Sequence, residues 1–272
     1  MTLLTEPTRI VLAKGYTLPD DADAVAYIAA VEAADGQVLE TATRMAINSF
    51  VKGCKADGIW PAIKASCILA GARTLTGALV PLVGAAPTNV NFVSGDYNRK
   101  TGIVGDGSTK YLNLNRTPND DPLNSVHFST YVNSVSSIAE RDYIGSTNTA
   151  VSPNVIYQII DSGGFGLACD IGLNGAVSGA GNTRVGFYGG NRPSSTTVEV
   201  RVGSATSPVA PRNSSSKNSS LNYFLFCRNL NGSANRLSTR RHCFYSIGES
   251  LNLSLLDTRV TTLINAFAAA IP

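Results

Sequence analysis

Short segments of β type follow one another along the chain from about residue 92 onward. The clearest is Val126–Val132, in which Val126, Phe128 and Thr130 alternate with His127, Ser129 and Tyr131. Further candidate strands are Val155–Ile160, Phe165–Ile171, Arg184–Tyr188, Thr197–Val202, Asn222–Arg228 and Cys243–Gly248. Loops rich in Gly, Ser, Asn and Pro separate them. Short strands at such intervals predict a mainly β fold, an antiparallel two-sheet sandwich over about residues 90–271.

The part of the chain before these strands has helical patterns. Residues 1–19 look like an extended arm, because Thr8–Leu12 is strand-like and Pro19 stops it. Asp20 is the expected N-cap of a first helix that ends at Asp35-Gly36. A second helix is expected over about residues 37–52, closed by Gly53, and a third from Trp60-Pro61 to about Ala70. The predicted organisation is therefore an N-terminal arm (1–19), a small α-helical module (20–88) and a β-sandwich domain (89–272).

A last helix is expected at the C-terminal end of the β-domain. Ser254 and Asp257 have the spacing of a capping box. The apolar residues that follow share one face of a 3.6-residue period: Leu256, Val260, Leu263, Ile264 and Phe267. We expect this face to be buried against the sandwich.

Composition limits the class of protein. Hydrophobic residues make up 43% of the chain and charged residues 15%, which indicates a globular chain. No apolar run approaches the roughly 18 residues that cross a bilayer, so we expect no membrane insertion. Glu6 and Pro7 interrupt the start, so we expect no signal peptide. The five cysteines show no Cys-x-x-Cys spacing, which favours free buried thiols and folding in a reducing cytoplasm.

Charge is distributed unevenly. Residues 1–60 contain eight acids against five bases, whereas residues 171–248 contain nine bases and one acid, Glu199. One interpretation is a solubilising surface spread around the β-domain. Another is an electropositive face for an anionic glycan or an acidic neighbouring subunit. Nucleic acid is not an expected partner, because aromatic residues do not alternate with the bases as a stacking platform requires.

Two motifs resemble a known family. The stretch GDGSTKYLNL, with Asp106, Gly107, Tyr111 and Leu112, and the later Ile247–Leu251 (IGESL) resemble the concanavalin A-like, laminin-G-like jelly roll. The similarity covers roughly residues 90–271. Residues 31–84 resemble a helical module found before this domain in tail and other virion proteins of bacteriophages. The resemblance implies a jelly-roll fold and a virion setting, but no catalytic act, because the superfamily includes lectins, structural modules and glycanases.

Catalytic motifs are absent from the sequence. There is no Gly-x-Ser-x-Gly and no His-Glu-x-x-His. The nearest match to the paired carboxylates of a sandwich glucanase is Glu140-x-Asp142, but Gly145 stands where the second glutamate is needed. We interpret it as a surface ion cluster. His127 and His242 lie in strand-like contexts and are expected to be structural. We therefore expect a protein that is not an enzyme.

Neither a metal nor a cofactor is expected. The jelly-roll superfamily binds calcium through loop carboxylates, and five aspartates are available for that role: Asp106, Asp120, Asp121, Asp161 and Asp170. Acidic turn residues are common for backbone reasons alone, so they do not predict a site.

The expected role is that of a phage virion structural protein, made in the host cytoplasm. It is either a tail fibre or tail-associated receptor-binding protein for host-surface polysaccharide, or a purely architectural capsid decoration or baseplate protein. Candidate ligand-binding residues are Tyr188, Asn191, Arg192, Arg212 and Lys217, in two expected loops. A simpler alternative is that Gly189 and Gly190 only turn the chain and that the basic residues only keep the surface hydrated. Partners are expected to be other virion proteins and further copies of this chain, a trimer by analogy, with the small-residue face Ala42/Ala46/Ser49 in close contacts.

Overall fold

The structure is a computed structural model of the 272-residue chain and describes residues 19–134, 141–148, 151–161, 164–171, 177–180, 185–209 and 220–272. These residues form two largely antiparallel β-sheets, helices in the first part of the chain, and one long helix that follows the last strand. The helices are α1 (Ala22–Asp35), α2 (Thr41–Ala56), α3 (Leu75–Ala78) and α4 (Leu253–Ala270), with short 3-10 turns at Trp60–Ala62, Ser94–Asp96 and Pro118–Asp120. The predicted arm at residues 1–18 lies outside the described residues.

The first sheet has the order β14-β13-β12-β7-β18-β1-β2, and β5 pairs with both β18 and β4. All of its pairs are antiparallel. Its strands are β1 (Ile63–Ile68), β2 (Pro81–Val83), β4 (Tyr97–Asn98), β5 (Gly102–Val104), β7 (Val126–Ser134), β12 (Gly186–Arg192), β13 (Val198–Val202), β14 (Ala205–Val209) and β18 (Arg241–Gly248).

The second sheet has the order β11-β10-β9-β8-β15-β6-β3, with β16 beside β8 and β17 beside β16. Its pairs are antiparallel except for the parallel pair β16–β8. Its strands are β3 (Thr88–Val90), β6 (Tyr111–Asn113), β8 (Arg141–Asn148), β9 (Val151–Asp161), β10 (Gly164–Ile171), β11 (Val177–Ala180), β15 (Phe224–Leu225), β16 (Arg228–Leu230) and β17 (Ser233–Asn235).

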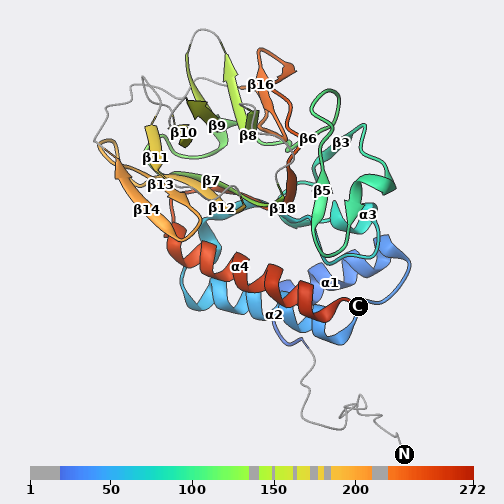
Figure 1. The fold of residues 1–272 in the computed structure, drawn as a ribbon. Helices are drawn as coiled ribbons and strands as arrows, with labels where there is room; N and C mark the ends of the chain where they lie inside the picture. Colours follow the sequence, from blue (N-terminus) through green and yellow to red (C-terminus); the bar gives the residue numbers. More distant parts are fainter. Residues whose placement is uncertain are drawn as a thin grey trace, which may run out of the picture.

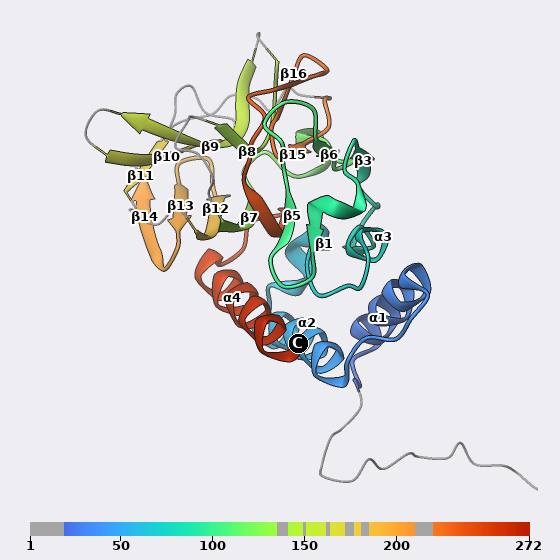
Figure 2. The same cartoon turned by 45° about the vertical axis from the view of Figure 1, so that its right-hand side comes forward.

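The molecule has three layers, which are the helices, the first sheet and the second sheet (Figures 1 and 2). One hydrophobic core lies between the sheets, where Tyr188 of β12 meets Tyr143 of β8 with ring centroids 5.0 Å apart. A second core lies between the first sheet and α1, α2 and α4. Phe187 belongs to this second core while its neighbour Tyr188 belongs to the first, because successive side chains of a strand point to opposite faces.

The third predicted helix is wrong. Only Trp60–Ala62 turns, and residues 63–68 form β1, which pairs with β18 at the far end of the chain. Pro61 is compatible with the start of a helix, but residues 63–68 pair with β18, and this long-range pairing overrides the local helical propensity. The range 20–88, predicted as a helical module, therefore also contributes β1 and β2 to the first sheet, and β3 of the second sheet begins at its last residue.

The helix boundaries differ from the sequence patterns in informative ways. Asp21, rather than Asp20, caps α1 by accepting hydrogen bonds from the N–H groups of Asp23 and Ala24. Gly36, with φ 66°, ends α1 as predicted. Asn252, rather than Ser254, caps α4. The predicted burial of Leu256, Val260, Leu263, Ile264 and Phe267 is confirmed.

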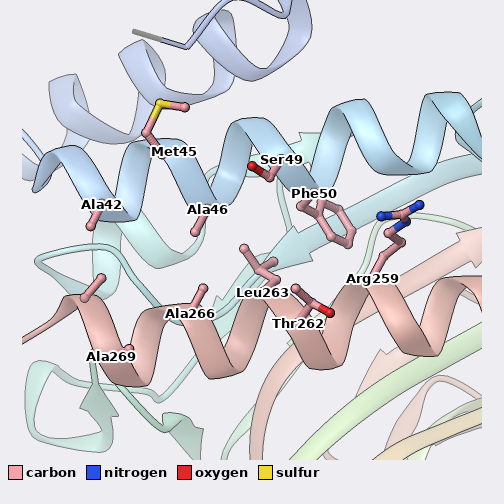
Figure 3. Close-up of a pocket in the computed structure, with 11 residues that line it drawn as sticks. Ala42, Met45, Ala46, Ser49, Phe50, Arg259, Thr262, Leu263, Ala266 and Ala269 are labelled. Carbon is pink, nitrogen blue, oxygen red and sulfur yellow. The ribbon is translucent and has the colours of Figure 1, made fainter. Parts of the chain in front are cut away.

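Gly53 does not end α2 but lies within it, at the contact with α4. A Cβ atom at this position would meet the guanidinium group of Arg259, which forms an ion pair with Asp57 at 2.7 Å. The two helices run side by side, with small residues on the facing sides (Figure 3). Glycine is therefore needed here for the approach of an arginine and not for a chain reversal.

The Gly105–Ser108 turn connects the two sheets instead of forming a hairpin. β5, before the turn, belongs to the first sheet, and β6, after it, belongs to the second. Asp106 holds the turn by accepting hydrogen bonds from the Thr109 hydroxyl and from the N–H groups of Ser108, Thr109 and Lys110, and these bonds keep the pKa of its carboxyl below the usual range.

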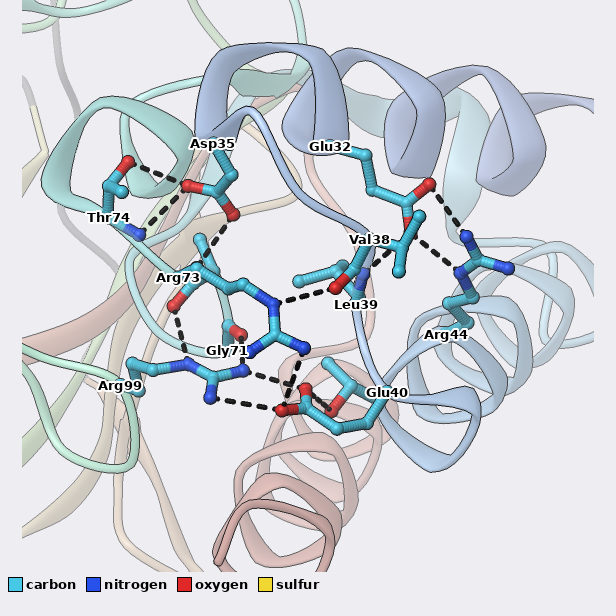
Figure 4. A network of polar contacts seen from close by, with 12 residues as sticks. Glu32, Asp35, Val38, Leu39, Glu40, Arg44, Gly71, Arg73, Thr74 and Arg99 are labelled. Carbon is cyan, nitrogen blue, oxygen red and sulfur yellow. Dashed lines mark hydrogen bonds and ion pairs between the residues drawn. The ribbon is translucent and has the colours of Figure 1, made fainter.

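Ion pairs and carboxylate hydrogen bonds fasten the helices to the loops of the sandwich (Figure 4). Glu40 accepts hydrogen bonds from both terminal nitrogens of Arg99, at 3.1 and 2.7 Å, and also pairs with Arg73. Because the Arg99 guanidinium stabilises the charged form, the pKa of Glu40 falls to about 2. Asp35 accepts from the N–H groups of Arg73 and Thr74. The α1–α2 connection is thus fixed to the sandwich at several points.

Candidate functional site

The predicted ligand-binding segment 188–192 is not an exposed loop, and that prediction is wrong. These residues form most of β12, paired with β7 on one side and β13 on the other. Gly189 does not turn the chain. A Cβ atom there would meet the ring of Phe187 and the side chain of Leu253, so the glycine allows α4 to approach the sheet.

Tyr188 is fully buried between the sheets, so its ring has no surface on which a sugar could stack. Arg192 is also fully buried, and its guanidinium donates to Asn124 Oδ1 at 2.9 Å and to the Ser195 carbonyl at 3.2 Å. It holds a loop of the protein and does not face solvent. Arg212 and Lys217 lie outside the described residues, so their ligand-binding role stays a prediction.

Asn191 is the predicted residue that borders a cavity. Its side chain is 3% exposed, donates to Glu199 Oε2 at 3.2 Å and accepts from the N–H of Leu251 at 3.2 Å. These bonds tie β12 to β13 and to the segment that leads into α4. The amide is therefore held rigidly at the edge of an opening.

This opening, which we call the polar pocket, has a volume of about 470 Å³ and lies where β12, β13 and β14 meet the start of α4. Its lining residues are Asn191, Pro193, Glu199, Thr206 and residues 250–254. The carboxylate of Glu199 and the exposed side chains of Thr206 and Asn252 supply acceptors and donors. No basic side chain is among the described residues that line it, so its chemistry suits a neutral polyhydroxylated ligand better than an anionic one.

The walls of the polar pocket are supported from behind. Arg201, 6% exposed, donates to Thr206 Oγ1 at 2.6 Å and pairs with Asp257 of α4 at 2.7 Å. Ser250 is fixed by Ser125, whose hydroxyl accepts the Ser250 N–H at 3.0 Å. The pocket is consequently pre-formed by the contact between α4 and the first sheet.

Much of the basic charge of residues 171–248 is internal. Arg192, Arg201 and Arg240 are buried, and Arg240 donates to the Tyr143 hydroxyl at 3.2 Å. Arg228 forms an ion pair with Asp142 at 3.2 Å, and Arg236 lies 4.0 Å from the same carboxylate. These arginines hold the sandwich together, which weakens the interpretation of an electropositive face.

The predicted surface ion cluster around Glu140 and Asp142 is corrected in the same way. Glu140 lies outside the described residues, and the Asp142 side chain is fully buried. Its arginine partners come from β16 and the segment after β17, so the carboxylate serves internal ion pairing.

Both histidines are buried. His127 contacts the Glu249 carbonyl and the Ser246 hydroxyl, and His242 contacts the Thr130 hydroxyl at 2.7 Å. Burial lowers the pKa of His127 to about 4 and that of His242 to about 3. Four cysteines are likewise buried and free, as predicted, namely Cys54, Cys67, Cys227 and Cys243.

The part of the chain that the structure describes has no cluster of metal ligands and no membrane-spanning helix. There, no three or more His, Cys, Asp or Glu side chains gather closely enough to hold a metal ion. None of the helices described is long and apolar enough to cross a membrane.

Comparisons with known proteins found no matching family model and no matching curated protein. Several solved structures show distant structural similarity. One is the receptor binding domain of botulinum neurotoxin C/D mosaic serotype, at 12% sequence identity over 74% of this chain and 51% of that chain, with a TM-score of 0.44. Another is a mutant of Trypanosoma rangeli sialidase displaying trans-sialidase activity, at 9% identity over 81% of this chain and 39% of that chain, with a TM-score of 0.41. A third is "NanB plus Optactamide", at 14% identity over 51% of this chain and 24% of that chain, with a TM-score of 0.34. This chain spans about half or less of each structure's length, and the fold described here rests on its own strand pairing and packing.

Proposed function

We propose that this protein is a bacteriophage virion structural protein, a tail fibre or tail-associated component that binds host-surface glycan. Its β-sandwich would be of the concanavalin A-like, laminin-G-like class. The sequence motifs around Asp106 and Ile247 support the class, and the resemblance of residues 31–84 supports the virion setting. The protein would be made in the host cytoplasm, act without catalytic turnover, cofactor or nucleic acid, and assemble as a homo-oligomer with other virion proteins.

The polar pocket is the observation that carries glycan binding. Sugars are bound through many hydroxyl groups, each of which needs a fixed donor or acceptor, and pre-formed clefts with a few placed polar groups are the usual ligand sites. Glu199 can accept two such bonds, and Thr206 can donate or accept. Because the lining is uncharged apart from Glu199, we expect binding that changes little with salt.

A second candidate function is a purely architectural one, as a capsid decoration or baseplate protein. The burial of Tyr188 and Arg192 favours it, since it removes an aromatic platform and a cation from the expected contact surface. In that case the polar pocket would be a by-product of the contact between α4 and the sheet.

A glycan array tests the proposal with matched variants. Thr206→Val removes a hydroxyl from the polar pocket, and Glu199→Gln replaces a carboxylate acceptor with an amide donor, both at nearly constant size. Thr196→Val removes a hydroxyl at an exposed position outside the lining. Wild type and Thr196→Val should bind the same glycans, with the two pocket variants about tenfold or more weaker, as expected for the loss of a buried hydrogen bond. Binding that survives both pocket changes would place the ligand elsewhere.

Antibody labelling of intact particles separates the two functions. Label on the tail together with array binding supports the receptor-binding role. Label along the head, with no binding to any glycan, supports the architectural role. Light scattering of the purified chain tests the homo-oligomer, for which a trimer is the expected mass.

A further inference from the structure

A second pocket, which we call the aromatic pocket, lies between α1 and β2, at the other end of the first sheet from the polar pocket. α1 and β14 lie on opposite sides of the molecule (Figure 2). The aromatic pocket has a volume of about 380 Å³. Its lining residues are Asp23, Ala26, Tyr27 and Ala30 of α1, Trp60, and Pro81, Leu82 and Val83 of β2. The two openings are therefore independent sites.

Two aromatic side chains of this pocket carry donors without acceptors. Tyr27 is 6% exposed, yet its hydroxyl has no hydrogen-bond partner among the residues that the structure describes. The indole N–H of Trp60 lacks an acceptor in the same part of the chain. Burial raises the pKa of Tyr27 well above its usual value, so the hydroxyl stays protonated. Because a buried donor without an acceptor costs free energy, these groups indicate a ligand that brings acceptors.

Charge around the aromatic pocket is balanced within the protein. Asp23 is the one charged residue among the described residues that line it, and its carboxylate pairs with Lys55 at 2.7 Å. The Lys55 ammonium also lies over the ring of Trp60, 5.7 Å from its centroid. One face of the indole is therefore occupied by a cation of the protein. The pocket suits an uncharged ligand that accepts hydrogen bonds, rather than a cation or a sugar ring stacked on that face.

The wall formed by β2 limits how an extended peptide could bind. β2 has three residues and is the last strand of the first sheet in the described structure, but Pro81 has no N–H to donate. Short edge strands that contain proline are poor templates for the addition of another strand. A peptide at this edge would consequently be held by the side chains of the pocket and by its two donors.

We propose that the aromatic pocket binds a proline-containing segment of another protein in the polyproline II conformation. Prolines present carbonyl acceptors without N–H donors, which matches the free Tyr27 hydroxyl and Trp60 indole N–H. Their rings would pack against Leu82 and against Ala26 and Ala30, both of which are exposed. Such segments are already extended before binding, so they lose little conformational entropy in an aromatic-lined groove. This site is separate from the polar pocket and does not depend on glycan binding there.

Fluorescence of the full-length protein tests the proposal directly, because Trp60 is the single tryptophan of the chain. Decaproline should change its emission in a saturable way, and a Gly/Ser peptide of the same length should not. Tyr27→Phe removes the free hydroxyl and keeps the ring, and it should weaken binding of decaproline by about fivefold or more. Tyr111→Phe makes the same change on β6 of the second sheet, outside the lining, and should bind as the wild type does.

Anisotropy of fluorescein-labelled decaproline measures the affinity of each variant without relying on the indole. Ala26→Leu, which fills the aromatic pocket, should abolish binding, whereas Ala33→Leu, exposed on the same helix outside the lining, should not. Circular dichroism confirms that both variants are folded. Equal responses to decaproline and the Gly/Ser peptide, no response to either, or binding that survives Ala26→Leu would overturn the proposal. So would a response to a neutral oligosaccharide such as maltoheptaose that Ala26→Leu removes, in the absence of one to decaproline, because the pocket would then take a sugar.

Discussion

The carboxylate of Asp35, the last residue of α1, lies in the space that a side chain at Gly77 would occupy. A Cβ atom at position 77 would collide with Oδ1 of Asp35. The same carboxylate accepts hydrogen bonds from the N–H groups of Arg73 and Thr74 and from the Thr74 hydroxyl, at 2.7, 2.8 and 2.6 Å. Glycine at 77 is thus what allows α1 to hold the loop before α3.

Gly77→Ala should destabilise the fold, because it forces the Asp35 carboxylate away from its three donors. We expect a loss of about 1–3 kcal/mol, the usual cost of overpacking. Gly95→Ala is the control, since a Cβ atom there meets nothing within 4 Å. Urea unfolding measures both, and equal stability of the two variants would mean that the Asp35 contact is dispensable.

Phe267→Ala tests the docking of α4. The ring is fully buried and lies against Gly71, where a Cβ atom would come within 2.8 Å of it. Loss of a buried aromatic ring should cost about 3–5 kcal/mol. Asn265→Ala, on the exposed side of the same helix, should change stability by less than about 0.5 kcal/mol. A measured loss below about 1 kcal/mol for Phe267→Ala would contradict the packing described here.

The Arg201–Asp257 pair offers a test that separates pairing from burial. Both residues are nearly buried, at 6% and 7% exposure. Arg201→Met should cost about 3–5 kcal/mol because it leaves the Asp257 carboxylate without its cation. The double variant Arg201→Met/Asp257→Leu should recover most of that loss, since apolar replacements of a buried pair are often neutral. A double variant no better than the single one would show that the pair is not coupled.

Acid should destabilise the protein through its buried histidines. Burial lowers the pKa of His242 in the folded state to about 3, so the unfolded state binds the proton first. The contribution of His242 to the free energy of unfolding is therefore complete above about pH 7 and is lost as the pH falls from 6.5 through about 3. Glu40 makes a separate contribution to the acid sensitivity, in a lower pH range. With a folded pKa of about 2, its contribution is complete above 4.5 and is lost as the pH falls from there through 2.

His242→Phe isolates this effect. The imidazole lies between Phe226 and Tyr143, with ring centroids 4.5 and 5.7 Å away, and the Thr130 hydroxyl keeps its bond to the Phe244 carbonyl. Between pH 7.5 and 5.0 the wild type should lose about 2 kcal/mol more than the variant. Urea unfolding at the two pH values measures the difference, and parallel losses would rule out His242 as the acid-sensitive group.

Local hydrophobic periodicity was enough to predict the elements in which the spacing of apolar residues is itself clear. The alternation of β7 and the apolar face of α4 are both visible in the sequence and present in the structure. Residues 63–68 could not be placed in this way, because their strand exists through pairing with Arg241–Gly248. The Trp60-Pro61 pair is compatible both with the start of a helix and with a single turn that leads into a strand, so the local sequence does not distinguish them.

The candidate site was harder to predict than the fold. The segment Gly189-Gly190-Asn191 has the composition of a turn, yet Gly189 is needed because the side chains of Phe187 and Leu253 occupy the space beside it. The polar pocket combines Asn191, Glu199 and Thr206 with residues 250–254, which are distant in sequence. The one available signal was that Glu199 is the single acid among the bases of residues 171–248.

The pairing of β1 with β18 sets the order of events when the protein is made. The Ser66 hydroxyl donates to the Tyr245 carbonyl, across 179 positions of sequence. A ribosome that adds about 5–20 residues per second needs roughly 9–36 s to cover that interval. Throughout this time Ile63 and Ile68 have no strand beside them on the β18 side, and the surface that will receive α1 and α2 is unfinished. The first sheet is therefore completed only after β18 is synthesised, and products truncated before Arg241 lack the strand that joins β1 to β7.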